Sequence, residues 1–354
     1  MAKKNMILPK NFKEIVSSND MAAFKKVFDK CDINAVTKGF YATSALGSNS
    51  INMEQMRWLI SQGADLELKD SYGNTPLKSH CAKWDGQKQT RLLVESGANI
   101  NATNNEGVSV LAVAADCIRY DNVVYLLENG ANPLHKNDRD QIPLEYALSR
   151  ASNTKIVGLV SVSKAFFDRG VKITKEMKES ITRIGKSFEF HREAFNPESV
   201  DEYSNALDEL YKMYGVEPVV RRIVHDGVSD IIVEKNEPME QFKKLWGYLV
   251  PSSGKAKTVQ GEVIRIAGRI EDEINRNGGY NWDGQYKKML KAFIQHISSY
   301  NSLPDNLVNE ANEISLILNN KEYTERVERY CIMAVKWVEL NPKPIILEKV
   351  NYKR

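Results

Sequence analysis

The tripeptide Gly63-Ala64-Asp65 recurs as Gly97-Ala98-Asn99 and again as Gly130-Ala131-Asn132. The three glycines lie 34 and then 33 residues apart (97 − 63 and 130 − 97). Self-similarity at a fixed period of this size is typical of proteins in which one small unit stacks on the next. The period therefore predicts an elongated array in this part of the chain.

A second phrase keeps the same phase, and helical patterns lie between the two phrases. Each of these helical patterns ends shortly before the glycine of the first phrase, where a helix needs a left-handed stop. The unit is thus a helix, a turn, a second helix and a glycine. The copies of the second phrase are Gly73-Asn74-Thr75-Pro76-Leu77, Gly107-Val108-Ser109-Val110-Leu111 and Asp140-Gln141-Ile142-Pro143-Leu144, and the helix ends are Arg57-Trp58-Leu59-Ile60, Arg91-Leu92-Leu93-Val94 and Val124-Tyr125-Leu126-Leu127.

These phrases resemble ankyrin repeats. Thr75-Pro76-Leu77 is close to the family's TPLH signature, with Lys78 where that signature has His. The resemblance covers about residues 10 to 170 and implies a solenoid that binds other proteins. We expect four to five repeats in residues 1–172, the first of them degenerate with Cys31 in place of glycine, and the last with an insertion before Gly170.

The net charge, the cysteine spacing and the N-terminal residues indicate which classes of protein this chain can belong to. The chain has 354 residues and a formal net charge of +3, a balance that does not by itself indicate nucleic-acid or membrane binding. Its four cysteines, at 31, 81, 117 and 331, form no CxxC pair, so we expect reduced thiols and no zinc site. The apolar run at the N-terminus stops at Pro9, too early for a signal peptide, and we expect a cytoplasmic protein.

The 33-residue phase is lost from about Ile173, so we predict a separate domain over residues 173–354. Thr174 can cap a helix from Lys175 to Phe190, and a second helix from Pro197 ends at Gly215. Two β-rich runs, at 218–224 and 229–233, flank His225-Asp226-Gly227 and predict a small hairpin. The expected fold class is mainly α: an ankyrin-repeat solenoid followed by a separate helical domain with a small β-hairpin.

The most unusual stretch runs from Trp246 to Arg269, where a small-residue loop leads into a helix that reaches about Asn275. Glu262, Arg265 and Arg269 share one stripe of that helix, which is either an ion-pair ladder or a binding surface. The stretch resembles a series found in uncharacterised bacterial and phage proteins, VPSSG, TVQGE, IRxxGR, RNG and NWD. That resemblance covers most of residues 188–350, implies a bacterial or phage origin, and assigns no chemistry.

An enzyme is the competing interpretation, with its centre in the second half and the ankyrin array selecting the substrate. His225 as a base, with Glu262, Arg265 and Arg269, could form a hydrolytic or transfer centre, joined by Asp226, Gln260, Asn281 and Asp283. Alternatively, the two arginines are buried partners of Glu262 and Asp283. Ser253-Gly254-Lys255 fails the phosphate-loop pattern because Leu249 and Ala256 stand where Gly and Ser or Thr are needed. No metal-hydrolase or serine-hydrolase motif occurs, and no basic run interleaved with aromatics accompanies the arginines.

The candidate partner-binding residues lie at the turns of the repeats. Polar turn residues are often turn formers only, whereas an exposed Trp84 would be a natural anchor. The candidates are Tyr72, Trp84, Asn104, Asn105, Glu106, Asp138 and Arg139, with Arg265 and Arg269 in the second half.

The leading hypothesis is an adaptor or inhibitor that holds a target protein without chemistry, for instance in phage counter-defence or toxin neutralisation. We expect no cofactor and no metal, a protein partner rather than nucleic acid or a membrane, and a second copy of the chain as a further candidate partner. An enzyme predicts that His225, Glu262, Arg265 and Arg269 line an open pocket. An adaptor predicts that they are paired and closed.

Overall fold

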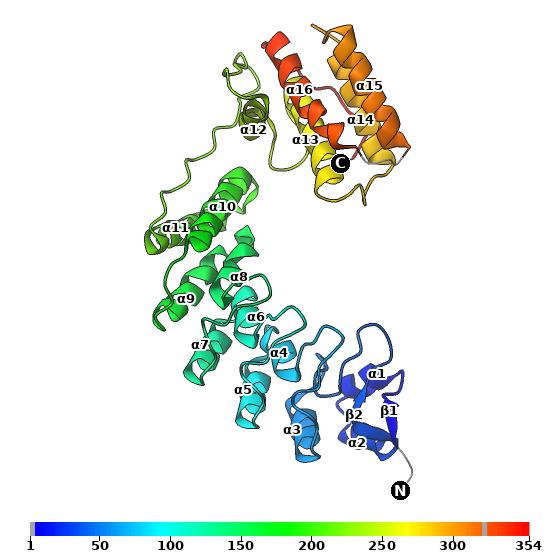
Figure 1. Ribbon diagram of the computed structural model, residues 1–354, viewed down its shortest axis with the longest axis vertical. Coiled ribbons are helices and arrows are strands. Elements are labelled where there is room, and N and C mark those ends of the chain that lie inside the picture. The colour runs from blue at the N-terminus through cyan, green and yellow to red at the C-terminus, as the bar shows by residue number, and fades with distance from the viewer. Residues whose placement is uncertain (1–3, 321–323, 354) are drawn as a thin grey trace. The chain divides into compact units, whose positions relative to one another are not determined.

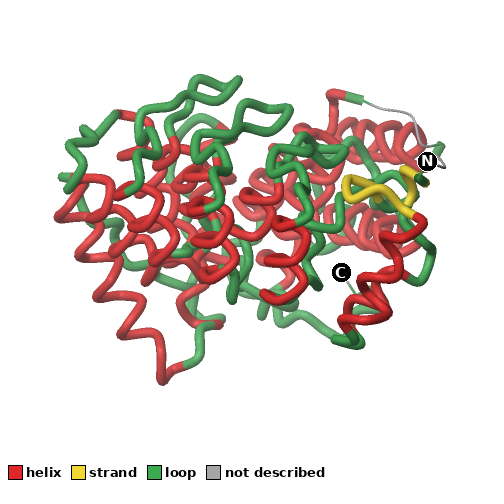
Figure 2. Tube along the Cα trace, turned by 90° about the horizontal axis from the view of Figure 1, so that it is seen from below, coloured by secondary structure: helices red, strands yellow, loops and turns green. Residues whose placement is uncertain are grey.

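The computed structural model describes residues 4–320 and 324–353, and most of them are helical (Figures 1 and 2). The chain divides into two compact units. The first comprises the described residues up to 188 together with 196–219, and the second comprises 189–195 and the described residues from 220 onward.

The first unit is built from helix pairs that repeat along the chain. One row is formed by the first helices of the repeats, α4 (Pro76–Cys81), α6 (Val110–Asp116) and α8 (Pro143–Ser149), and a second row by α3 (Met53–Ser61), α5 (Gln87–Glu95), α7 (Tyr120–Glu128) and α9 (Ile156–Phe167) (Figure 1). A short turn, η1 (Asn153–Lys155), precedes α9 and accounts for part of the insertion expected in that repeat. The glycines predicted to stop the helices, 63, 97, 130 and 170, have φ of 81°, 97°, 92° and 76°.

The second phrase of the repeat starts the first helix of each pair. The Thr75 hydroxyl accepts the backbone N–H of Lys78 at 3.4 Å, and Pro76 occupies the first turn, where a missing N–H costs nothing. Leu77 is completely buried. Ser109 caps α6 in the same way, whereas α8 has Ile142 at its cap position and no side-chain cap hydrogen bond from it. The buried leucine recurs in all three copies, as Leu77, Leu111 and Leu144.

The N-terminal end of the array is covered by the degenerate first repeat. It contains α1 (Phe12–Ser17), α2 (Met21–Lys30) and two parallel strands, β1 (Asn5–Ile7) and β2 (Cys31–Val36), which are the strands within the described residues (Figure 2). Phe24 and Phe28 pack edge-on against each other with ring centroids 5.4 Å apart, and both contact Trp58 of α3. Aromatic packing therefore joins this repeat to the next one.

Two further helices belong to the first unit: α10 (Lys175–His191), up to residue 188, and α11 (Pro197–Tyr214). Both helices were predicted, with Thr174 and Gly215 at the expected cap positions. They pack on the last repeat: the Tyr214 hydroxyl donates to Ser163 at 2.7 Å, and Arg183 donates to the carbonyl oxygen of Leu148 at 2.8 Å. The compact unit thus extends past the boundary predicted at residue 172, because α11 packs on α9 and Arg183 of α10 is bonded to the end of α8.

The second unit is a helical cluster around α13 (Val259–Asn275). Val263, Ile266 and Ile270 of this helix are completely buried. The surrounding helices are α12 (Pro238–Leu249), α14 (Gly284–Ile297), α15 (Asp305–Asn319) and α16 (Glu328–Leu340), with the short turn η3 (Glu325–Val327) before α16. The turn η2 (Arg192–Ala194) also belongs to this unit. Tyr330 and Trp337 on α16 are completely buried.

The predicted hairpin at 218–233 was wrong. The turn is present, since Gly227 has φ of 92° and the Asp226 carboxylate accepts the backbone N–H groups of residues 228 and 229. The flanking runs, however, do not pair with each other. The N–H of His225, directly after the first run, donates to Tyr248, and that of Ile231, in the second run, donates to Pro342. The two sides of the turn are therefore bonded to different helix ends. The local β signal is overridden by tertiary hydrogen bonds.

Candidate partner-binding surface

The turns between repeats are held by one side chain each. Asp70, Asn104 and Asn137 each accept two backbone N–H groups, from the residues two and four positions later, at 2.8 to 3.1 Å. Such turns satisfy the backbone locally. Asn104, a predicted partner residue, therefore has a structural role in its turn, and Asn137 plays the same role in the next repeat.

Successive turns are also hydrogen-bonded to one another. The N–H of Asn105 donates to Tyr72 at 3.1 Å, and that of Asp138 donates to Glu106 at 3.2 Å. Gly73 has φ of 80°, and a Cβ there would lie 2.2 Å from Oδ1 of Asn105, so only glycine allows this approach. The tips form one continuous row that presents Asn105, Glu106, Asp138 and Arg139 on its exposed side.

Three aromatic side chains cluster at the start of this row. Phe40, Tyr41 and Tyr72 are 76%, 70% and 46% exposed. Their ring centroids lie 5.3 Å (Phe40 to Tyr41), 5.6 Å (Tyr41 to Tyr72) and 6.4 Å (Phe40 to Tyr72) apart. Tyr72 was predicted from the repeat, whereas Phe40 and Tyr41 were missed because they precede the regular phrases. Two adjacent aromatics after Gly39, in a polar stretch, were the available signal.

Trp84 lies in the loop after α4 and is 84% exposed. The guanidinium of Arg119, from the next repeat, lies over its ring at 5.1 Å from the centroid. The Nε of the same arginine donates to the carbonyl oxygen of Ala82 at 3.0 Å. An exposed indole held against a cation provides apolar contact area at a defined position.

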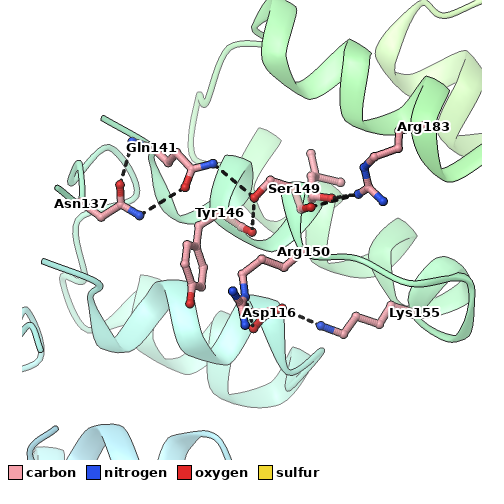
Figure 3. Close-up of polar contacts among 9 residues, drawn as sticks. Asp116, Asn137, Gln141, Tyr146, Ser149, Arg150, Lys155 and Arg183 are labelled. Carbon is pink, nitrogen blue, oxygen red and sulfur yellow. Dashed lines mark hydrogen bonds and ion pairs between the residues drawn. The ribbon is translucent and has the colours of Figure 1, made fainter. Parts of the chain in front are cut away.

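The ends of the first helices α4, α6 and α8 each bind cations from the segment that follows, which is the next repeat for α4 and α6 and the helix α10 for α8. At the end of α4, Ala82 accepts the bond from Arg119 described above. At the end of α6, Asp116 accepts a bond from Nε of Arg150 at 3.3 Å and one from Nζ of Lys155 at 2.5 Å (Figure 3). Arg183 does the same for α8 through the carbonyl oxygens of residues 148, 149 and 151. Positive charge suits the C-terminal end of a helix dipole. We call the row of Arg119, Arg150, Lys155 and Arg183 the cation row.

Two of the charged residues predicted on α13, Glu262 and Arg265, are closed off from solvent. Glu262 is completely buried and Arg265 is 1% exposed. The two form a bidentate pair, with Nε to Oε2 at 2.8 Å and Nη2 to Oε1 at 2.6 Å. The Tyr352 hydroxyl donates to Oε1 of Glu262 at 2.6 Å. Burial favours the neutral acid, but these hydrogen bonds hold the pKa of Glu262 below its usual range.

His225 is not part of this pair. Its Nε2 lies 2.8 Å from the carbonyl oxygen of Ser229, and its Nδ1 accepts the N–H of Gly227 at 3.0 Å, so both ring nitrogens are engaged in the turn that contains the residue. Arg269 is half-buried on α13. The four candidate catalytic residues therefore do not converge on one open site.

The other residues of the motif stretch also have structural roles. Thr258 caps α13 and Asp283 caps α14. Glu273 accepts hydrogen bonds from Asn277 and Asn281, which fixes the turn through Gly278 and Gly279. Gln260 donates to the carbonyl oxygens of residues 341 and 343.

Two pockets are lined by other residues. One of about 520 Å³ in the second unit is lined by Ile223, Ile232, Leu245 and Tyr248 among others, and one of about 700 Å³ in the first unit is lined by the lysines of α10. Within residues 4–320 and 324–353, no group of three or more His, Cys, Asp or Glu side chains is placed to hold a metal ion. In the same residues, no helix has the length and apolar character needed to cross a membrane. All four cysteines are free.

The geometry of the first unit is that of an ankyrin-repeat array, and residues 40–140 match the family described as "Ankyrin repeats (3 copies)". The chain is also similar to two proteins of Arabidopsis thaliana. It is 39% identical over 98 residues to "Putative E3 ubiquitin-protein ligase XBAT35", covering 27% of this chain and 21% of that protein, and 37% identical over 98 residues to "Putative E3 ubiquitin-protein ligase XBAT34", covering 27% and 26%.

A viral protein shows the same kind of similarity. "Putative ankyrin repeat protein FPV244" of fowlpox virus (strain NVSL) is 33% identical over 80 residues, which are 23% of this chain and 12% of the viral protein. The aligned segment thus spans about a quarter or less of each relative. The ankyrin repeats predicted from the sequence are confirmed, and such repeats indicate a protein-binding role.

Proposed function

We propose that this protein is a binding protein that holds another protein on its ankyrin array and carries out no reaction of its own. The observation that carries the proposal is the exposed cluster of Phe40, Tyr41 and Tyr72 at the start of the row of tips. Aromatic residues dominate the energetics of protein interfaces, and clustered exposed apolar residues mark such interfaces.

The second unit supports the non-catalytic part of the proposal. A hydrolytic centre at Glu262 and Arg265 would need solvent or substrate to reach them, and both are buried in a mutual ion pair. We propose that this unit is a folded module that extends the binding protein. In keeping with the motif series in residues 250–283, we propose a bacterial or phage adaptor or inhibitor, acting in counter-defence or toxin neutralisation in the cytoplasm.

The test compares two exposed tyrosines of the same unit. Tyr72 and Tyr120 are both 46% exposed, but only Tyr72 belongs to the aromatic cluster. The protein, a Tyr72→Ser variant and a Tyr120→Ser variant are used to capture proteins from bacterial lysate, and captured proteins are then purified and titrated against each variant. We expect a stoichiometric partner whose affinity falls about tenfold or more with Tyr72→Ser and is unchanged with Tyr120→Ser.

The triple variant Phe40→Ser/Tyr41→Ser/Tyr72→Ser should abolish capture while circular dichroism and thermal unfolding stay unchanged, since all three rings are exposed. Equal capture by the triple variant, or capture of no stoichiometric protein by the unaltered chain, would contradict the proposal.

A further inference from the structure

Two arginines of the cation row are held in position by the fold itself. Arg119 is fixed by its Nε hydrogen bond to Ala82 and by the ring of Trp84, 5.1 Å from its guanidinium carbon. Arg150 is fixed by its Nε bond to Asp116 and by the ring of Tyr146, at 5.2 Å (Figure 3). In both cases one edge of the guanidinium is bonded and one face is stacked.

This arrangement leaves the outer nitrogens available. Within the described residues, no hydrogen bond is found for either Nη atom of Arg119 or Arg150. An arginine that is stacked and bonded through Nε loses little conformational entropy when its Nη atoms bind a carboxylate. The two side chains are therefore pre-oriented to receive anionic groups.

The local charge favours an anionic partner. Arg119, Arg150 and Lys155 contribute three positive charges, and Asp116 between them contributes one negative charge, which Arg150 and Lys155 already neutralise. Asp85, the other acid beside Trp84, is paired with Lys83 at 3.6 Å. Glu106 also acts electrostatically on Arg150. Counted together, the three cations and the two acids Asp116 and Glu106 leave a net charge of +1 on this surface (3 − 2).

Trp84 adds an apolar requirement. Its indole is 84% exposed beside Arg119, so a bound segment that reaches the arginine also covers the ring. Desolvation by an apolar side chain strengthens the neighbouring charge-assisted hydrogen bonds.

We infer that Trp84, Arg119 and Arg150 bind an acidic segment of the partner protein, in which two carboxylates engage the two arginines and an apolar side chain covers the indole. This inference rests on the proposed function, because it specifies the partner that the array would hold. The interaction is non-covalent and spans two successive repeats.

The probe is a library of random 12-residue peptides displayed on phage and selected on the full chain. We expect the selected peptides to be enriched in Asp and Glu next to an aromatic or aliphatic residue. A fluorescein-labelled copy of one selected peptide should bind with an affinity that falls about tenfold in Arg119→Met and in Arg150→Met, since a charge-assisted pair is worth about this much. Binding should also weaken in Trp84→Ala, whose exposed side chain does not support the fold.

Arg91→Met is the matched control. Arg91 is also stacked on a tyrosine of the next repeat, Tyr125, at 4.6 Å, but it lies on the second row of helices. This variant should bind the peptide as the unaltered chain does. Thermal unfolding of every variant verifies that the array is intact.

Three results would overturn the inference: selection of no peptide or of peptides without acidic enrichment, equal losses in Arg91→Met and Arg119→Met, or a 12-nucleotide single-stranded DNA that binds more tightly with the same dependence on the arginines. If a captured partner depends on Tyr72 but not on Arg119 or Arg150, the proposed function stands and this inference fails.

Discussion

The ammonium of Lys78 donates a hydrogen bond of 2.8 Å to the carbonyl oxygen of Val108 in the next repeat. Lys78 stands where the family signature has His, and it is only 3% exposed. Burial disfavours its charged form and lowers the pKa of the amine to about 8. A departure from the signature thus joins two repeats at the cost of a buried cation.

Lys78 should make the stability depend on alkaline pH. Between about pH 8 and its unfolded pKa near 10.5, the unfolded chain holds a proton at this lysine that the folded chain has released, so stability rises with pH over this window. The effect is on the order of 3 kcal/mol at most. Urea unfolding of the unaltered chain and Lys78→Met is measured at pH 7, 8, 9 and 10. The free energy of unfolding of the unaltered chain should increase relative to that of the variant as the pH rises. A constant difference between them would contradict this assignment.

His80 should make the stability of the folded chain depend on pH in the acid range. Its ring is completely buried, with Nε2 2.9 Å from the carbonyl oxygen of Leu46, and burial lowers its pKa to about 4. The folded chain resists protonation between pH 6.5 and 4, whereas the unfolded chain accepts the proton, so stability falls as the pH falls through this range. The measurement is the free energy of unfolding of the unaltered chain and of His80→Gln at pH 7 and pH 5. The stability of the unaltered chain relative to the variant should be smaller at pH 5 than at pH 7.

The buried ion pair of the second unit should be sensitive to loss of one partner. Glu262→Gln leaves Arg265 buried without its counter-charge and should destabilise the unit by about 3 to 5 kcal/mol. Asp272→Asn on the same helix is the control, because the Asp272 pair with Arg276 is solvent-exposed and should contribute less than about 1 kcal/mol. Equal effects in chemical unfolding would show that the buried pair is not needed for stability.

Replacing either of two glycines near the α12–α13 contact with alanine should change the stability, but in opposite directions. A Cβ at Gly268 would lie 2.5 Å from Cζ3 of Trp246, so Gly268→Ala should destabilise by about 1 to 3 kcal/mol through overpacking. A Cβ at Gly247, within α12, meets nothing within 4 Å, and Gly247→Ala should stabilise by up to about 1 kcal/mol through helix propensity. Thermal unfolding of both variants tests this, and a tolerated Gly268→Ala would show that the helices can separate without cost.

Much of the fold was predictable because its signals are local. The stops at Gly97 and Gly130, the caps at Thr75 and Thr174 and the buried face of α10 all depend on residues within one or two turns of each other. The hairpin around Asp226 was not predictable by the same means, because its turn is local but the partners of its flanks are Tyr248 and Pro342.

Some residues of the candidate partner-binding surface could be predicted from the sequence, and others are brought there only by the fold. Tyr72 and Trp84 could be found from their positions in the repeat, and both are exposed. Phe40 and Tyr41 meet Tyr72 only because the first repeat stacks on the second, about 30 residues along the chain.

The sequence by itself determined that the chain carries ankyrin repeats, since a repeat period is written in residue types and needs no long-range contact to be recognised. The tertiary structure decided which charges are used and which are available. Stacking brings Arg119 to Ala82 and Arg150 to Asp116, each one repeat away, and the packing of other helices around α13 buries the pair of Glu262 and Arg265. Whether an arginine is buried in a pair or presented to a partner depends on such neighbours, because the free energy of a charge is set by its surroundings rather than by its place in the sequence.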